Sequence, residues 1–190
     1  IETDEILRLY IAYKKNLGSK YLISQHGGVY GTRLIPTKSE FYELRVADKW
    51  ISWGHGGLDN NKIVKGLNIK SSGKKIIKPH PGGRILFVLP NITYIPSRLM
   101  PLLPLKRINQ NREIINNLKD KVLEKITIRP HPNHLRMKYV GYIANDCEIS
   151  SMKNFSDDLR NSQLLITTNN STTFLESLSM NFPSILILLD

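Results

Sequence analysis

Cysteine is nearly absent from this sequence, since Cys147 is the one cysteine among 190 residues. A single cysteine excludes a disulfide framework and any zinc site built from several cysteines, and it is typical of a reducing compartment. Long apolar runs are also missing: the longest, Ile85–Leu89 and Ile185–Leu189, have the length of strands. Because a membrane-spanning helix needs roughly 18 unbroken apolar residues, no part of the sequence predicts one.

Acidic residues are few compared with basic ones: 16 Asp and Glu stand against 27 Lys and Arg, which gives a net charge of +11. This imbalance favours an anionic partner such as nucleic acid, acidic lipid or a phosphorylated metabolite. The basic residues are spread along the chain, with short clusters only at Lys74-Lys75 and Lys106-Arg107. No helix has a dense basic face and no RNP, KH or zinc-finger pattern is present. Nucleic-acid binding is therefore the weaker interpretation.

The two ends of the sequence lack the usual marks of a complete chain. It begins at Ile1 without Met, a basic leader or an apolar leader, so no signal peptide is expected. It stops at Asp190, directly after an apolar run that is typical of a strand. We therefore expect the chain to be truncated at both ends and to belong to a longer cytoplasmic protein.

The first 58 residues combine helix and strand patterns. Their apolar spacing indicates the C-terminal part of an α/β domain, and Thr3 is the expected cap of its first helix. Residues 59–83 are polar, rich in lysine and interrupted by Gly, Pro and Ser, which predicts a linker. The elements predicted in this first part are helices over 3–17 and 39–47 and strands over 21–24 and 50–53.

Residues 84–190 show a regular alternation of strands and helices. Such alternation is typical of parallel strands joined by right-handed crossovers, as in a doubly wound sheet. We therefore expect residues 84–190 to form an incomplete Rossmann-like domain that binds a nucleotide. The predicted elements are strands over 85–89, 125–129, 164–167 and 185–189 and helices over 109–124, 155–161 and 172–180.

The unusual polar residues follow the ends of predicted strands. His26 lies in a glycine-rich loop after the first strand, Arg129-Pro130-His131-Pro132 follows a second, and Asn169–Thr173 follows a third. Ligands of parallel α/β sheets bind at the carboxyl ends of the strands. We therefore expect these three segments to line a cleft, with Gln25, Gly27 and Gly28 in its loop.

The segment Ser171–Thr173 stands at the predicted start of a helix. Such a start offers unpaired backbone N–H groups and a partial positive charge, which suit a phosphate. The alternative is an ordinary capping box, in which Thr173 and Glu176 satisfy the helix start themselves. The neighbouring Arg129 and His131 sit in a proline-stiffened loop and are expected to contact the phosphate. Their surroundings lack the ligand spacing of a metal site.

His26 has the position of a general base, because a histidine at a glycine-rich strand end is open to substrate. The alternative is a structural histidine. Glu40 and Glu43 are spaced i, i+3 on the second predicted helix, which favours a solvated helix face, with one of them pointing into the cleft as the alternative. Trp50 and Trp53 are expected in the core or in the wall of the cleft.

Several motifs occur together in a fixed order. They are Gln25-His26-Gly27-Gly28, Trp50-Ile51-Ser52-Trp53-Gly54, Arg129-Pro130-His131-Pro132 and Leu164–Thr173 with Glu176 and Pro183. This set resembles the GT-B-fold transferases that build bacterial surface polysaccharides, in particular a group of surface-carbohydrate transferases with a Gln-His-Gly-Gly loop. The resemblance extends to CDP-glycerol glycerophosphotransferases and to CMP-Kdo and sialyl transferases.

The resemblance implies a GT-B-like fold with two Rossmann-like halves. It implies an acceptor-side domain within residues 1–58, with His26 as the catalytic base. Donor phosphate or nucleotide would be bound by Arg129, His131, Ser171, Thr172, Thr173 and Glu176. Two departures leave the donor open: Asn169-Asn170 replace an Asp-Tyr pair, and Tyr30-Gly31-Thr32-Arg33 lack a Lys that follows the histidine in the glycerophosphotransferases.

The function expected from these features is transfer of a sugar or polyol-phosphate group, without metal or other cofactor. The donor would be a nucleotide-sugar or CDP-polyol, and the acceptor a surface glycan or a lipid-linked molecule. The protein would work in the cytoplasm, in contact with the anionic inner face of the cell membrane, and would bind no nucleic acid. The alternatives are a GT-B-type nucleotide-sugar epimerase and a basic nucleic-acid-binding protein.

Overall fold

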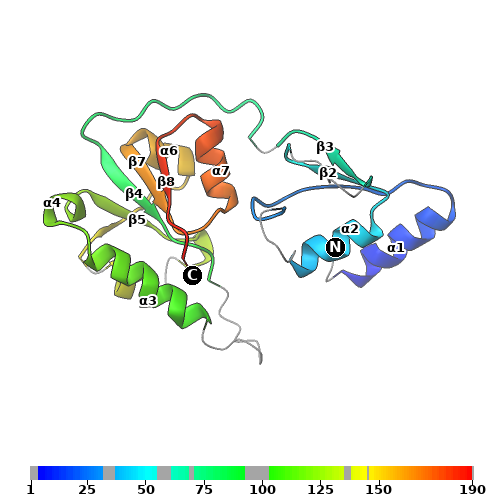
Figure 1. Cartoon of the computed structure of the whole chain (residues 1–190), viewed down its shortest axis with the longest axis horizontal. Helices are drawn as coiled ribbons and strands as arrows, with labels where there is room; N and C mark the ends of the chain where they lie inside the picture. Colours follow the sequence, from blue (N-terminus) through cyan, green and yellow to red (C-terminus); the bar gives the residue numbers. More distant parts are fainter. Residues whose placement is uncertain are drawn as a thin grey trace. The chain divides into compact units, whose positions relative to one another are not determined.

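The computed structural model describes residues 4–31, 37–54, 61–68, 71–92, 103–134, 138–144 and 146–189. The predicted cap Thr3 and the residues Thr32 and Arg33 lie outside these ranges. The chain divides into two compact units, Ile1–Gly73 and Lys74–Asp190, which are drawn in Figure 1. Each unit is built around its own parallel sheet, so the predicted α/β architecture is confirmed.

The first unit holds a three-stranded sheet in the order β1-β2-β3, with all pairs parallel. A small core of Ile23, Tyr30, Ala47 and Trp50 lies against it. The short strand β3 lies inside the segment 59–83 that the sequence analysis treats as a linker. The elements are β1 (Leu22–Ser24), β2 (Lys49–Ser52), β3 (Ile63–Lys65), α1 (Glu5–Asn16) and α2 (Lys38–Val46).

The helices of this unit begin at side-chain caps. The carboxylate of Asp4 accepts a hydrogen bond from the Leu7 N–H at 2.9 Å, so Asp4 caps α1 where the sequence analysis expects Thr3. The Thr37 hydroxyl accepts from the Glu40 N–H at 3.2 Å and caps α2. Both side chains satisfy a backbone donor that has no partner within its helix.

The second unit holds a five-stranded sheet in the order β6-β5-β4-β7-β8, with all pairs parallel. In chain order this is the 3-2-1-4-5 arrangement of doubly wound dinucleotide-binding sheets. The strands are β4 (Arg84–Val88), β5 (Ile126–Arg129), β6 (Glu148–Ile149), β7 (Ser162–Thr167) and β8 (Ser184–Leu186). The helices are α3 (Leu103–Asn116), α4 (Asp120–Leu123), α5 (Lys138–Ala144), α6 (Phe155–Arg160) and α7 (Thr172–Ser179).

The central strand β4 is buried on both faces of this sheet. Successive side chains of a strand point to opposite faces, and here Phe87 joins a core cluster with Ile115 of α3. Its neighbour Leu86 joins a second cluster with Leu159 of α6 and Leu165. Helices therefore cover both faces, which explains why β4 is an unbroken apolar run.

The four strands predicted for this unit are confirmed, but the single helix predicted over 109–124 is wrong. It is two helices, because Lys119 has an extended backbone (φ −67°, ψ 146°) and starts α4 anew. The Asn117 side chain donates to the Glu113 carbonyl at 2.8 Å, which occupies a carbonyl near the end of α3. Helix α5 and strand β6 are not predicted. Among the described residues, no helix combines the length and apolar character needed to cross a membrane.

Candidate functional site

The loop after β1 is held in place by Gln25. This side chain is buried, and its amide donates to the Gly27 carbonyl at 2.7 Å. Its oxygen accepts from the Trp53 N–H at 2.8 Å, which fixes the loop to the end of β2. A Cβ atom on Gly27 would lie 3.3 Å from the Tyr30 ring, so the loop packs closely on that ring. Gln25 and Gly27 thus shape the loop that carries His26.

His26 projects from this loop with an exposed side chain, 65% accessible to solvent. Its ring packs edge-on against Tyr30, with 5.0 Å between the ring centroids. The Tyr30 hydroxyl oxygen lies 3.1 Å from His26 Nε2 and 3.4 Å from Nδ1. Both ring nitrogens of His26 therefore lie near the Tyr30 hydroxyl, while most of the side chain stays exposed to solvent, where a bound hydroxyl group could reach it.

Two carboxylates of α2 point into this loop, so their prediction as solvated residues is wrong. Glu40 and Glu43 are only 6% and 7% exposed. The Glu40 Oε1 atom accepts from the Gly31 N–H at 2.9 Å. The Glu43 carboxylate lies beside His26 and Tyr30 at the core of the unit. Their i, i+3 spacing on the helix was visible in the sequence, but nothing local indicated which face is buried.

Glu43 is surrounded by three hydrogen-bonding side chains. Its Oε1 atom accepts from the Tyr30 hydroxyl at 3.3 Å and lies 3.5 Å from His26 Nδ1. Its Oε2 atom accepts from the Trp50 indole N–H at 3.3 Å. Trp50 is buried and stacks on Tyr30 with 5.7 Å between centroids, so it belongs to the core as expected.

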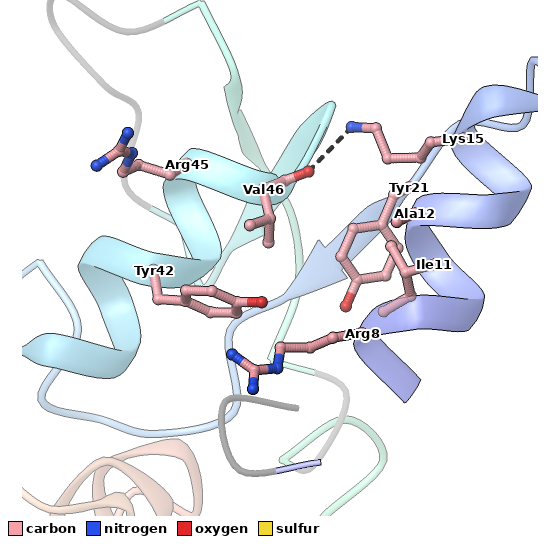
Figure 2. A pocket seen from close by; sticks show the side chains of 8 residues that line it. All are labelled: Arg8, Ile11, Ala12, Lys15, Tyr21, Tyr42, Arg45 and Val46. Atoms are coloured by element: carbon pink, nitrogen blue, oxygen red, sulfur yellow. Dashed lines mark hydrogen bonds between the residues drawn. The ribbon is translucent and has the colours of Figure 1, made fainter. Parts of the chain in front are cut away.

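A pocket of about 400 Å³ lies between α1 and α2 (Figure 2). It sits at the amino ends of β1 and β2, whereas His26 follows the carboxyl end of β1. Lys15 crosses it to donate to the Val46 carbonyl at 3.0 Å and to Asp48 at 2.9 Å. The Tyr21 N–H and Lys15 lower the pKa of Asp48 by hydrogen bonding to its carboxylate. The lining residues are Arg8, Ile11, Ala12, Lys15, Tyr21, Tyr42, Arg45 and Val46.

In the second unit, Arg129 ends β5 and is engaged by the protein itself. Its guanidinium pairs with the buried carboxylate of Asp158 on α6. It also donates to the Met152 carbonyl at 3.0 Å. Asp158 in turn accepts from the Ser150 hydroxyl at 2.6 Å. Arg129 therefore ties β5 to α6 and to the loop after β6, a role different from the phosphate contact expected for it.

His131 follows two residues later and packs against a second histidine. The His131 and His134 ring centroids are 5.3 Å apart, and the buried His134 Nδ1 lies 2.5 Å from the Tyr139 hydroxyl. Burial, and secondarily the neighbouring His134, lower the pKa of His131 below its ordinary value of 6.5. His131 is therefore mainly neutral at pH 7, and it offers a hydrogen bond without a full positive charge.

The start of α7 follows β7 and differs from a capped helix. Ser171 is the N-cap residue, but its side chain makes no capping hydrogen bond. The capping box of Thr173 and Glu176 is therefore not formed. The Glu176 carboxylate instead pairs with Lys74. The first N–H groups of α7 have no acceptor within the helix, as at any helix start.

A side-chain contact holds the loop before this helix start, and a separate cavity lies at the end of β5. The Thr168 hydroxyl donates to the buried Asn111 Oδ1 at 2.8 Å, which holds the loop after β7 against α3. Beside the end of β5 there is a cavity of about 290 Å³. It is lined by Arg129, Pro130, Pro132, Ser150, Ser151, Met152 and Lys153.

The structure brings the predicted residues of the second unit to one edge of its sheet. Strands β5 and β7 both pair with β4, so His131 and Ser171–Thr173 follow the carboxyl ends of strands that flank the same central strand. The chain reverses its winding direction between β4 and β7, which is where doubly wound sheets bind their ligands. His26 belongs to the first unit, with Gln25, Gly27 and Gly28.

The sequence was also compared with known proteins. No curated protein matches the chain. The family model of the LIC12162 family transferases matches residues 1–189, a range that includes both units and all of the candidate site residues. The chain therefore belongs to the LIC12162 family of transferases.

Proposed function

We propose that this transferase moves a sugar or polyol-phosphate group from a nucleotide-activated donor to a hydroxyl of a glycan or lipid-linked acceptor. The second unit binds the donor, and the first unit supplies the base. The observation that carries the proposal is the uncapped start of α7 beside the β4–β7 reversal of the five-stranded sheet. Two parallel α/β units are also what a GT-B fold requires, which supports that fold for the whole enzyme.

The donor phosphate is expected at the start of α7. The unpaired N–H groups of Thr172 and Thr173 and the partial positive charge of the helix start favour an anion. The Ser171 hydroxyl makes no capping bond and is thus a further donor, and the hydroxyls of Thr172 and Thr173 follow it in the first turn. His131 adds a neutral hydrogen bond from the end of β5. Together these groups stabilise the nucleotide phosphate as it leaves.

The acceptor hydroxyl is activated by His26 in this proposal. The imidazole takes the hydroxyl proton while the acceptor oxygen bonds to the anomeric carbon of a sugar donor, or to phosphorus of a polyol-phosphate donor. The bond from that atom to the nucleotide phosphate oxygen breaks, and its electron pair departs with the nucleotide. The acceptors are those of surface-polysaccharide synthesis at the inner face of the cell membrane.

A thermal-shift screen against CMP, CDP, UDP and GDP tests donor binding. A ligand present at 100 times its Kd adds about 2.7 kcal/mol to the folded state. For a protein of this size we expect the melting temperature to rise by roughly 5–10 °C with the cognate nucleotide. The absence of a shift with all four nucleotides at millimolar concentration would contradict the proposal.

Calorimetric titration of two histidine variants tests where the nucleotide binds. His131→Ala removes one neutral hydrogen bond, so we expect the affinity to fall by roughly 2- to 12-fold, or about 0.5–1.5 kcal/mol. His80→Ala is the matched control, because His80 is exposed and also lies between two prolines. Equal affinities of wild type and His131→Ala would remove His131 from the donor site.

A further inference from the structure

We propose that Glu43 is the positioning residue of His26: it holds the imidazole through Tyr30 and balances the charge that the imidazole gains with a proton. This inference rests on the proposed function, in which His26 is the base. It adds a carboxylate that no motif of the sequence indicates, and it makes Glu43, Tyr30 and His26 one acid–base unit.

The burial of Glu43 is the first step of the argument. A carboxylate that is 7% exposed needs hydrogen bonds or a positive charge to remain ionised. Its two hydrogen-bond donors, Tyr30 and Trp50, are neutral groups at 3.3 Å. Among the described residues, no lysine or arginine pairs with Glu43, and the cationic partner within reach is the protonated form of His26, at 3.5 Å. Glu43 and His26 are therefore placed to form an ion pair when the imidazole takes a proton.

The geometry of Tyr30 is the second step. Its hydroxyl donates to Glu43 Oε1 and its oxygen lies 3.1 Å from His26 Nε2. A hydroxyl that donates to a carboxylate can accept from a protonated imidazole, so it transmits part of the negative charge. The Trp50 indole fixes the second carboxylate oxygen, so Glu43 cannot easily rotate away. Tyr30 and Glu43 thus orient the imidazole through both of its ring nitrogens, while the side chain as a whole stays exposed to solvent.

The helix provides a matched control. Glu40 is equally buried on the same helix, but it accepts from the Gly31 N–H rather than approaching His26. Among the described residues, Glu43 from α2 and Tyr30 from the loop are the titratable groups seen to contact the imidazole. Removing the charge of Glu40 should therefore disturb the loop, but it should change the proton affinity of His26 less than removing the charge of Glu43 does.

Proton NMR titration of His26 in the whole protein is the direct test, and it needs no substrate. Glu43→Gln keeps the shape of the side chain but removes the charge that stabilises the imidazolium. We expect the titration midpoint of His26 to be lower in Glu43→Gln than in wild type, because a neighbouring negative charge is lost. Glu40→Gln should shift it by much less. Equal midpoints in wild type and Glu43→Gln would overturn the inference.

A transfer assay with the donor selected by the nucleotide screen gives the second readout. We expect His26→Ala to lose about 10²- to 10⁴-fold in rate. Glu43→Gln should lose about 10- to 100-fold, with the acid limb of its pH–rate profile moved to lower pH, because a neutral base then persists at lower pH. Unchanged nucleotide affinity in both variants would show that the loss concerns proton transfer.

The outcomes separate this inference from the proposed function. A His26→Ala enzyme that transfers at the wild-type rate would contradict the role of His26 as base, whatever Glu43 does. A large loss in His26→Ala together with a wild-type rate and pH profile in Glu43→Gln would overturn the role of Glu43 alone. If Glu43→Gln does not fold, Tyr30→Phe removes the bridging hydroxyl and keeps the ring. A wild-type midpoint and rate in Tyr30→Phe would then overturn the inference.

Discussion

Asp158 is the residue on which the loop arrangement at the end of β5 depends. Its buried carboxylate pairs with Arg129 and accepts from the Ser150 hydroxyl, so it connects three elements. Breaking a buried ion pair leaves an uncompensated charge, which is far more costly than losing an exposed pair. Arg129 therefore sets the position of the loop that carries His131, and in the proposed function it acts on the donor site through that loop.

This role can be tested with two neighbouring aspartates. We expect Asp158→Asn to lower the free energy of unfolding by about 3 kcal/mol, because it strands the buried Arg129 guanidinium. Asp157→Asn should cost about 1 kcal/mol or less, since Asp157 forms an exposed i, i+3 pair with Arg160. Urea unfolding of the two variants measures the difference. Similar losses in both would mean that the Arg129–Asp158 pair contributes little.

His131 makes the stability of the protein depend on pH. Its pKa is lower in the folded state than the ordinary value of 6.5, because burial and His134 disfavour the charged form. Between the lowered pKa and 6.5, the unfolded chain therefore binds more protons at His131 than the folded protein does. The contribution of His131 to stability is complete above pH 6.5 and is lost as the pH falls through this window. We expect the melting temperature to fall less steeply between pH 7.5 and pH 5 in His131→Gln than in wild type. An unchanged slope would contradict the assignment.

At the scale of elements, the position directly before β4 has no room for a side chain, because the backbone of Gly83 lies close to neighbouring atoms. A Cβ atom at Gly83 would lie 2.7 Å from the backbone oxygen of Asn161 and 3.0 Å from His80 Cβ. We expect Gly83→Ala to destabilise the protein by about 1–3 kcal/mol, because backbone atoms must shift. Gly141→Ala in α5 is the control. No atom lies within 4 Å of a Cβ atom at this position, so the substitution should raise the free energy of unfolding by at most about 1 kcal/mol. Denaturant unfolding measures both changes. If the two substitutions changed the free energy of unfolding in the same direction, the close approach at Gly83 would not be what limits this position.

The predictability of the elements follows their length and burial. Strand β4 is predictable because a strand covered by helices on both faces is a continuous apolar run, here residues 85–88. Strands β3 and β6 were missed because they have only three and two residues, too few for an alternation to be recognised. The break between α3 and α4 was missed because Asn117 and Lys119 interrupt the helix by local hydrogen bonding and backbone conformation rather than with glycine or proline.

At the scale of the whole molecule, the sequence reveals candidate site residues at strand ends but not the partners that tertiary packing brings to them. His26, His131 and Ser171 could be selected as candidates because glycine, proline and hydroxyl residues at strand ends are visible in the sequence. The side chains that contact these residues and determine their chemistry could not be identified from the sequence. Glu43 meets His26, and Asp158 meets Arg129, only through tertiary packing, and an i, i+3 pair such as Glu40 and Glu43 is typical of a solvated face.

The central claim is that a nucleotide phosphate binds at the start of α7 in the second unit. Amide hydrogen exchange of the whole protein, with and without the nucleotide that raises its melting temperature most, tests this claim most directly. The first N–H groups of α7 lack helical acceptors and exchange quickly until a phosphate accepts from them. The account predicts slower exchange at residues 171–174 and 130–134 when the nucleotide is bound. Unchanged exchange in both segments, with protection elsewhere in the chain, would contradict it.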